Sequence, residues 1–359
     1  MIPRLYTHQL LSPSDVEPSD PRMRVAGVFN PGVVAVSEGG RHAVLARVVE
    51  QPVEQRDGFL PSPRYDEGEL HLDWLALGDC DTRDPRTLAS KTTGRVRLRF
   101  VSHLRLFWVE HRGPGYATSA VEALRIMPTG VHESFGIEDP RITRIGDTYS
   151  FTYVGVSPRG VCTMLMSTRD FESFDRRGVI LPPDNKDVML FPSVVGGRYA
   201  MLHRPMPSML FAPPRVWFAQ SEDLLSWGGH RPVEGVSMGG AFRDRAGGST
   251  PPIFTERGWL VLVHGSDKQP GDGGAGVYSA GAVILDRDEP WRVVARTPGP
   301  FMRPEADFEQ RGFVDNVVFP TAALLRGDCL DVYYGAADEH VGVCGFDLAA
   351  LLTLCVPCD

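Results

Sequence analysis

The sequence is poor in the features that mark membrane, secreted and nucleic-acid-binding proteins. Its first stretch, MIPRLYTHQLLSPSDVEPSDP, contains no apolar segment of the kind found in secretory signals or membrane spans. The 359 residues carry a net charge of -8, which argues against nucleic acid as the main partner. We therefore expect a cytoplasmic protein with neither a membrane nor a nucleic-acid partner.

Cysteine is also scarce, with six residues scattered along the chain. In a reducing cytoplasm such residues are expected as free thiols. Cys355 and Cys358 form the sequence CVPC at the tail, but a zinc site would need two more ligands and no second CxxC exists. We expect a frayed tail carrying two thiols, and neither a metal nor a cofactor.

Helical periodicity is almost missing from the sequence. The one short candidate is DLAALLTL at residues 347–354, with Asp347 as its amino-terminal cap. The rest consists of short β-rich runs separated by turn residues, in a chain with 38 glycines and 30 prolines. This composition predicts an all-β fold with a short C-terminal helix.

Similar strand–turn–strand units recur along the chain. Each unit has a turn glycine, an alternating apolar strand, a break and a second strand; the turn glycines are Gly40, Gly146, Gly197, Gly258 and Gly327. Residues 69–81 are read as the partner of the first unit, and a less regular sixth unit fills 95–127. Six units can close as five blades if the first and last strands share one. We predict a single catalytic domain over 1–359, a five-bladed β-propeller with blades over about 27–350. A pair of β-sandwiches is the alternative.

The stretch GIEDPRIT places two acids at the start of a predicted strand. In a propeller the innermost strands begin around one central axis, so Asp139 would point toward it. Pro140 is tolerated at a strand start, and Arg141 can keep Glu138 or Asp139 charged. For EDPR in isolation, an ion pair that only pins a blade is an equally good interpretation.

Other units carry polar residues at matching places. They are Asn30 of FNPG, Lys186 and Asp187 of NKD, Arg204 of HRP, His264 of HGSD, Asp315 and Asn316 of DNVV, and Tyr333 and Asp338 of YYGAAD. Each has an ordinary structural alternative, but together they predict a polar funnel. Neither a GxSxG elbow nor a P-loop occurs, and the glycine-rich run 269–276 is expected to be a mobile loop. Acids, amides and aromatics suit a sugar, and cations suit an anion, which indicates glycoside cleavage involving an anionic partner.

These motifs resemble glycoside hydrolase family 130. FNPG, GIEDPRIT, KDVMLFPSVVGGRYAMLHRP, PPIFTERGWLVLVHG and VVFPTAALL with YYGAAD occur in the order of the family and cover about residues 27–350. The resemblance implies a five-bladed β-propeller. It also implies action on β-mannosides, since the family contains inverting phosphorylases and, in some branches, mannosidases that use water.

The resemblance assigns roles to individual residues. Asp139 would be the general acid, acting through a hydroxyl of the bound mannose while phosphate attacks the anomeric carbon from the opposite face. Phosphate would be held by Arg204, Arg245 and His264. The sugar would be held by Asn30, Glu138, Arg141, Lys186, Asp187, Tyr333 and Asp338.

Three functions stay open at this point. A phosphorylase would use inorganic phosphate as co-substrate and an oligosaccharide as substrate, without a cofactor. A mannosidase would need a carboxylate base, for which Glu305 and Asp307 are candidates. A propeller that binds sugar without catalysis is the third. Ser279, the apolar loop 205–214 and an insertion at 54–70, expected over the site mouth, depart from the family, so the linkage and acceptor sugar also stay open. So does assembly into a homo-oligomer.

Overall fold

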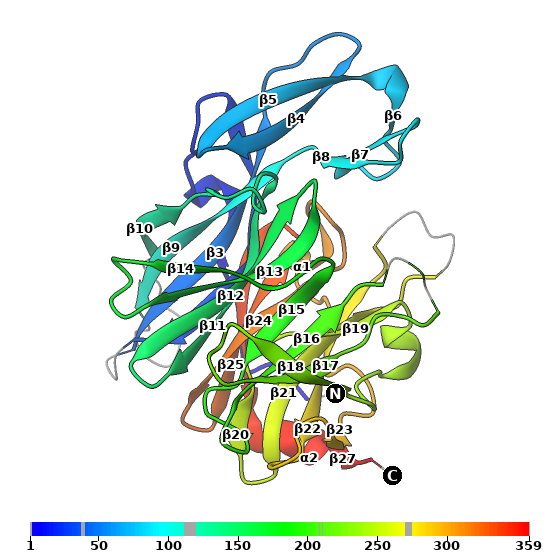
Figure 1. The fold of residues 1–359 in the computed structure, drawn as a ribbon. Helices are drawn as coiled ribbons and strands as arrows, with labels where there is room; N and C mark the ends of the chain where they lie inside the picture. Colours follow the sequence, from blue (N-terminus) through cyan, green and yellow to red (C-terminus); the bar gives the residue numbers. More distant parts are fainter. Residues whose placement is uncertain are drawn as a thin grey trace.

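The computed structural model describes residues 2–36, 40–110, 120–207, 209, 211–269 and 275–358 (Figure 1). The predicted all-β class is confirmed: within these residues strands dominate, and the α-helices are the single turn α1 (Asp307–Gln310) and the short α2 (Leu348–Leu354). Short 3-10 turns are η1 (Pro13–Asp15), η2 (Leu77–Asp79) and η3 (Gly239–Phe242). No helix in the described part of the chain is long and apolar enough to cross a bilayer.

The long strands form five antiparallel groups in chain order. The first contains β2 (Met23–Ala35), β3 (Arg41–Pro52), β9 (Val101–Glu110) and β10 (Ala120–Ile126). The second contains β11 (Gly136–Ile145), β12 (Thr148–Ser157), β13 (Gly160–Thr168) and β14 (Asp175–Leu181). The third contains β15 (Asn185–Leu190), β16 (Tyr199–Pro205), β17 (Trp217–Ser221) and β18 (Trp227–Pro232). A lone parallel pairing of Gly136 with Ser102 joins the first two groups into one sheet.

The last two groups bring the chain ends into the sheets. The fourth contains β19 (Arg245–Gly248), β20 (Ile253–Thr255), β21 (Gly258–Ser266), β22 (Tyr278–Leu285), β23 (Val293–Arg296) and β27 (Val356–Pro357). The fifth contains β24 (Val318–Arg326), β25 (Cys329–Ala336), β26 (His340–Asp347) and β1 (Tyr6–Leu11). β1 and β26, strands from opposite ends of the chain, share a sheet, although β1 lies outside the range 27–350 predicted for the blades.

The predicted turn glycines mark the same five groups. Each lies between an inner strand and the next strand, and each has a positive φ that favours glycine: Gly40 81°, Gly146 60°, Gly197 80°, Gly258 119° and Gly327 60°. The sixth predicted unit exists as β9 paired with β10, but it forms the outer part of the first group and is not a separate unit. Residues 69–81 are not the partner of the first unit either, since β3 pairs with β9.

Apolar layers connect the groups in a closed cycle. Separate clusters of buried side chains lie between the first and second groups, the second and third, the third and fourth, the fourth and fifth, and the fifth and first. Val28, Val44, Tyr333 and Val343 belong to the layer that joins the fifth group back to the first. Polar residues at the inner strand starts can therefore converge on one region.

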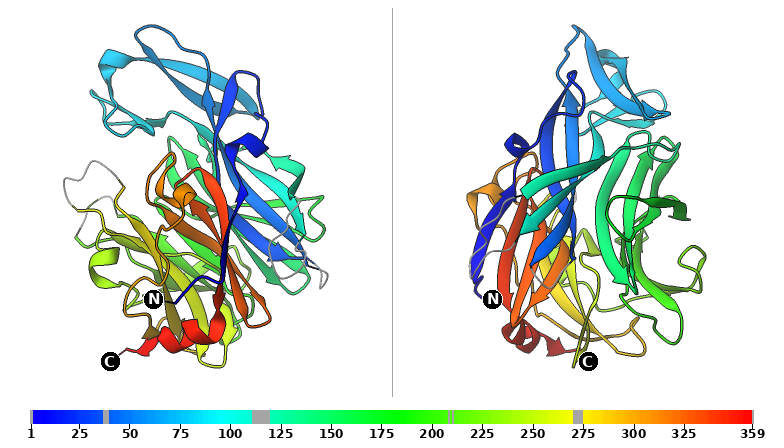
Figure 2. Two further views of the ribbon diagram at one scale, coloured as in Figure 1. Left: turned by 180° about the vertical axis from the view of Figure 1, so that it is seen from behind. Right: turned by 90° about the vertical axis from the view of Figure 1, so that its left-hand side faces the viewer.

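Residues 53–100 form an insertion between β3 and β9. It contains β4 (Phe59–Asp66), β5 (Glu69–Ala76), β6 (Cys80–Asp81), β7 (Thr87–Ser90) and β8 (Val96–Leu98), in two small sheets. In Figures 1 and 2 this insertion lies at one end of the molecule, and α2 with both termini lies at the other. The insertion can therefore cover only one end of the ring of strand groups.

The C-terminal segment is more ordered than the sequence suggested. The predicted helix exists, and the Asp347 side chain caps it by accepting a 2.7 Å hydrogen bond from the Ala350 N–H. The expected frayed tail was wrong, because β27 pairs with β23. Cys355 is buried, and burial raises the pKa of its thiol to about 11, so this cysteine is a packed thiol.

Candidate active site

Three inner strands carry a bulge at a polar residue. Asn30 (φ 47°), Asp139 (φ 50°) and Asp187 (φ 55°) adopt the left-handed conformation, which asparagine and aspartate tolerate better than other side chains. The strand pairing shifts register at each of them, in β2, β11 and β15. A bulge turns a side chain away from the regular alternation, so these three residues are re-aimed by the same backbone device.

A cavity of about 290 Å³ lies beside these bulges, and its lining includes Asn30, Asp139 and Lys186. Its polar lining consists of Asn30, Arg47, Asp84, Arg86, Thr87, Glu138, Asp139, Lys186, Arg204, Arg245, His264, Tyr278 and Asp338. Its aromatic lining consists of Phe29, Phe100, Phe313 and Phe319. Eight of the eleven predicted site residues lie in this lining. A small cavity that combines convergent polar groups with aromatic walls is typical of a ligand site.

One half of the cavity is acidic and is organised by Arg47. The Asp139 Oδ1 accepts hydrogen bonds from Asn30 Nδ2 at 2.9 Å and from Arg47 Nη1 at 3.1 Å. The second guanidinium nitrogen, Nη2, donates to Glu138 Oε1 at 2.6 Å. The rings of Phe29 and Phe100 lie 4.8 and 5.9 Å from the guanidinium carbon of Arg47. One buried arginine therefore holds both carboxylates in place.

The carboxylates of this half titrate differently. Burial pushes the pKa of Asp139 upward, but Arg47, Arg141 and the Asn30 hydrogen bond outweigh it, so the pKa is lowered. Burial and the neighbouring Asp139 raise the pKa of Glu138 against the pull of Arg47. Burial and the other two carboxylates raise the pKa of Asp338 to about 6. Glu138 and Asp338 therefore keep a proton more readily than isolated carboxylates would, whereas Asp139 loses its proton more readily.

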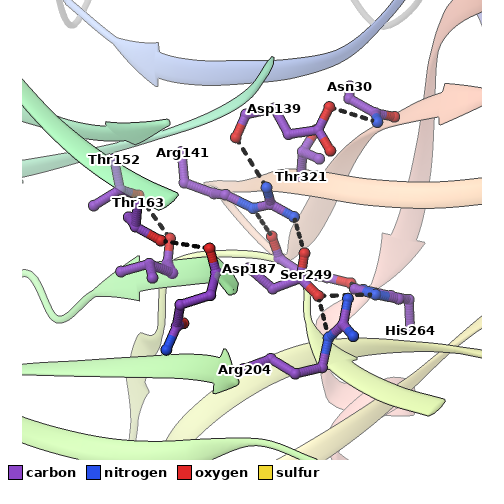
Figure 3. Close-up of polar contacts among 12 residues, drawn as sticks. Asn30, Asp139, Arg141, Thr152, Thr163, Asp187, Arg204, Ser249, His264 and Thr321 are labelled. Carbon is purple, nitrogen blue, oxygen red and sulfur yellow. Dashed lines mark hydrogen bonds and ion pairs between the residues drawn. The ribbon is translucent and has the colours of Figure 1, made fainter. Parts of the chain in front are cut away.

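The other half is cationic and surrounds one buried carboxylate. Asp187 Oδ2 accepts from Arg204 Nε at 2.6 Å and lies 3.4 Å from His264 Nε2, while Ser249 Oγ lies 3.0 Å from His264 Nδ1 (Figure 3). Among the described residues, Arg204 Nη1 is buried without a hydrogen-bond partner. Lys186 and Arg245 add further cations to the lining.

Electrostatics in this half favour an incoming anion. Burial opposes ionisation of Asp187, but Arg204 and His264 outweigh it and hold its pKa well below the usual range. Burial lowers the pKa of His264 to about 4 despite Asp187, so this imidazole is neutral at neutral pH. Arg245 is paired with Asp244 at 2.5 Å, but Asp187 alone cannot neutralise Arg204, Arg141 and Lys186 together. The excess positive charge and the unpartnered donor fit a bound anion.

Comparison with known proteins agrees with a site for a sugar and an anion. Residues 115–356 match the model of glycoside hydrolase family 130, described as β-1,4-mannooligosaccharide phosphorylase. The chain belongs to glycoside hydrolase family 130. A "Beta-1,2-mannobiose phosphorylase" of Listeria innocua is 36% identical over 355 residues, covering 97% of each chain. A "1,2-beta-oligomannan phosphorylase" of Thermoanaerobacter is 36% identical over 213 residues, covering 58% of this chain and 67% of the relative.

Solved structures of the family extend this likeness to the fold. The Listeria innocua phosphorylase in complex with β-1,2-mannobiose has a TM-score of 0.88 at 34% identity, covering 98% of this chain and 99% of that one. A structure described with family 130 glycoside hydrolases that target β-1,2-mannosidic linkages in Candida mannan has a TM-score of 0.68 at 20% identity, covering 97% and 96%. At that identity the second likeness shows the fold alone.

Two predicted sugar contacts of this family 130 member lie behind the cavity instead. Arg141 and Asp187 are 1% and 2% exposed and are not part of the lining. Arg141 donates through Nη1 to the Asp139 backbone carbonyl at 2.9 Å and through Nε to the Ser249 carbonyl at 3.2 Å, and its Nη2 lies 3.7 Å from Asp187 (Figure 3). These two residues brace the acidic half against the cationic half, and neither of them belongs to the cavity lining.

Tyr333, which was predicted as a sugar contact, does not line the cavity. Its side chain is fully buried between the fifth and first strand groups, and its hydroxyl lies 2.8 Å from His42 Nδ1. In β25 the alternation of side chains sends Tyr333 into this apolar layer, whereas the neighbouring turn brings Asp338 to the cavity.

The candidate bases for a mannosidase also lie elsewhere. Glu305 and Asp307 are exposed and lie outside the cavity lining, and Glu305 lies 3.7 Å from the Arg4 guanidinium. They stand at the start of α1, where acidic side chains are common. No part of the structure brings them to the cavity.

Several site residues were not predicted. Arg47 interrupts the apolar run VLARVVE of β3, and a charged residue at a buried strand position was the available signal. Asp84 and Arg86 come from the insertion, beyond the stretch 54–70 that was expected over the mouth. Ser279 is buried outside the lining, and loop 205–214 and the run 269–276 lie partly outside the described residues.

Proposed function

We propose that this protein is an inverting β-mannoside phosphorylase built on a five-bladed β-propeller. The observation that carries the proposal is the buried Arg204 Nη1 without a partner among the described residues, on a cavity side with more cations than carboxylates. Phosphate supplies the missing acceptor oxygens and the missing negative charge. The five strand groups and their closed cycle of apolar layers support the propeller. The names of the phosphorylases in the family support the substrate class.

In the proposed reaction, a phosphate oxygen attacks the anomeric carbon of a terminal β-mannosyl unit from the cationic side. The bond from that carbon to the glycosidic oxygen breaks, and the leaving oxygen takes a proton that Asp139 supplies through a mannose hydroxyl. The products are α-mannose 1-phosphate and the sugar shortened by one unit. Asn30, Glu138, Lys186 and Asp338 orient the mannose. Phosphate is already an anionic nucleophile, so the protein needs no base.

The lowered pKa of Asp139 fits this order of events. In the free cavity Arg47 keeps the carboxylate ionised. Phosphate would offset the positive charge of the cationic half, including Lys186, which contributes to that lowering. Bound phosphate would therefore raise the pKa of Asp139 and favour its acid form. A cytoplasmic location suits this chemistry, because the phosphorylated product is charged and stays in the cell.

Hydrolysis is the competing function, since family 130 structures include enzymes described as glycoside hydrolases. A hydrolase needs a carboxylate base on the face opposite the acid, with room for water. The only carboxylates among the described lining residues are Asp84, Glu138, Asp139 and Asp338. Glu138 and Asp338 surround Arg47 together with the acid, and Asp84 is paired with Arg86 in the insertion. This arrangement favours phosphate as the nucleophile.

The test is an incubation with β-1,2-mannobiose, β-1,4-mannobiose and mannosyl-glucose, each with and without phosphate. We expect mannose 1-phosphate only when phosphate is present, from one of these linkages. Free mannose formed equally fast without phosphate would show hydrolysis. Sugar binding without any product would show the non-catalytic propeller.

A further inference from the structure

A second, larger chamber lies outside the cavity. Its volume is about 910 Å³, against about 290 Å³ for the cavity itself. The two share six lining residues: Asp84, Arg86, Thr87, Ala275, Phe313 and Val314. The cavity therefore opens into the chamber through a junction made by the insertion on one side and by the segment before β24 on the other.

The junction carries an ion pair and an aromatic side chain. The Arg86 guanidinium donates to Asp84 through Nε at 3.0 Å and through Nη2 at 2.9 Å. Phe313 packs edge-to-face on Phe100, with ring centroids 6.4 Å apart. An ion pair next to a half-exposed ring is the chemistry that binds a sugar, through hydroxyl hydrogen bonds and through its apolar face.

The wall of the chamber mixes both signs of charge. Its acids are Asp81, Asp84, Asp267 and Asp315, and its cations are Arg83, Arg86 and Lys268. Four negative and three positive groups nearly cancel, unlike the cationic half of the cavity, and Asn316 adds an amide. Such a wall suits a neutral ligand rich in hydroxyl groups, because a polyanion would meet the four carboxylates and an apolar ligand would strip them of water.

We propose that this chamber is an acceptor channel for the sugar units beyond the cleaved bond, and that the protein favours β-mannooligosaccharides longer than the disaccharide. The inference rests on the proposed function for the reaction but makes a separate claim about chain length. In this account Asp84 and Arg86 of the insertion at 53–100 determine specificity at the junction. Asn316, in the segment before β24, contributes farther out. The cavity alone holds the terminal mannose and phosphate.

Substrate length gives the first test. With the linkage identified by the mannobiose assay, kcat/KM for phosphorolysis is compared for the di-, tri- and tetrasaccharide. We expect the trisaccharide to exceed the disaccharide by about tenfold, the effect of one additional well-occupied subsite. Equal values for all three lengths would overturn the channel and leave the proposed phosphorolysis standing.

A pair of variants ties the effect to the chamber. Asn316→Gly removes the amide at a position with φ 59°, which glycine adopts without strain, and Glu67→Gly makes the same change at φ 50° in the exposed β4–β5 turn. We expect Asn316→Gly to lower kcat/KM about threefold to tenfold for the trisaccharide and tetrasaccharide, and less than twofold for the disaccharide. The Glu67→Gly control should match the wild type at all lengths. Loss at all lengths for Asn316→Gly would contradict the assignment.

Calorimetric binding separates failure of the channel from failure of the reaction. The Asp139→Asn variant is titrated with the disaccharide and the tetrasaccharide of both linkages, with phosphate present. Tighter tetrasaccharide binding would support the channel even if no phosphorolysis were found. Equal affinity for both lengths would overturn it whatever the reaction is.

Discussion

The two halves of the cavity are built as electrostatic opposites. In the acidic half three carboxylates, Glu138, Asp139 and Asp338, surround the single guanidinium of Arg47. In the cationic half the carboxylate of Asp187 faces Arg204 and His264, with Lys186 nearby, while Arg245 is paired with Asp244. Each half has one central counter-ion and more charge than that counter-ion neutralises.

The unneutralised charge indicates what each half binds. Excess negative charge in the acidic half favours a retained proton and sugar hydroxyl donors, which general acid catalysis on a glycoside requires. Excess positive charge in the cationic half favours an anion. Arg141 lies between the halves, contacting the Asp139 backbone on one side and Asp187 on the other.

The largest effect is expected in the acidic half. Asp139→Asn keeps the size of the side chain and its position next to Asn30, but it removes the ionisable proton. We expect phosphorolysis to fall about 10²–10⁴-fold in kcat/KM with little change in melting temperature. Asp307→Asn is the matched control, because Asp307 is exposed outside the cavity. Near-full activity of Asp139→Asn would show that another group is the acid.

The cationic half should respond through phosphate. Arg204→Ala removes the unpartnered donor and one charge, and we expect the KM for phosphate to rise at least about tenfold while the KM for the sugar changes much less. Steady-state kinetics with each substrate varied separately measures this. Arg198→Ala is the control, since Arg198 forms a surface pair with Glu222 at 3.0 Å. Equal increases in both KM values would make Arg204 a structural residue.

The raised pKa of Asp338, in the acidic half, should make the stability of the protein depend on pH. Its pKa of about 6 lies above the ordinary 3.8, so the folded state binds more protons than the unfolded state in that interval. Stability therefore falls as pH rises from about 4 to 6. Asp338→Asn removes this loss of stability. The free energy of unfolding should rise by at most about 3 kcal/mol before solvent screening.

Thermal unfolding at pH 5 and pH 7 tests that sign. The variant should gain more over the wild type at pH 7 than at pH 5, although its activity falls because a sugar contact is lost. A larger gain at pH 5 than at pH 7 would contradict the raised pKa of Asp338. Glu339→Gln, at the next residue, is the matched control.

The smallest effect on activity is expected outside both halves. Tyr333→Phe removes the hydroxyl next to His42 in the layer between the fifth and first groups. We expect a stability loss of about 1 kcal/mol in urea unfolding and an unchanged kcat/KM. A large loss of activity with unchanged stability would return Tyr333 to the site.

Local patterns in the sequence predicted much of this molecule. Turn glycines and alternating strands indicated the five repeating groups. The dipeptides Asn30–Pro31 and Asp139–Pro140 were predicted to start strands, but they lie at bulges inside β2 and β11. The long-range features escaped this approach. Whether Tyr333 faces the core or the cavity depends on the strand register, and a shift of one residue reverses the face.

Arg47 and the insertion show a second limit. Arg47 lies 91 and 92 residues from the acids that it contacts, so only the fold brings them together. Asp84 and Arg86 belong to an insertion whose path over the cavity no local pattern indicates. Asp187 was predicted as a sugar contact because NKD stands at the place in its unit that matches EDPR, whereas the bulge turns the Asp187 side chain toward Arg204.

The configuration of the first product tests the central claim most directly. The protein is incubated with its preferred β-mannoside and phosphate, and phosphorus and proton NMR follow the sugar phosphate from the earliest turnovers. The account predicts α-mannose 1-phosphate, because phosphate on the cationic half attacks opposite the bond that Asp139 protonates. β-Mannose 1-phosphate, or free mannose with no phosphate ester, would contradict it.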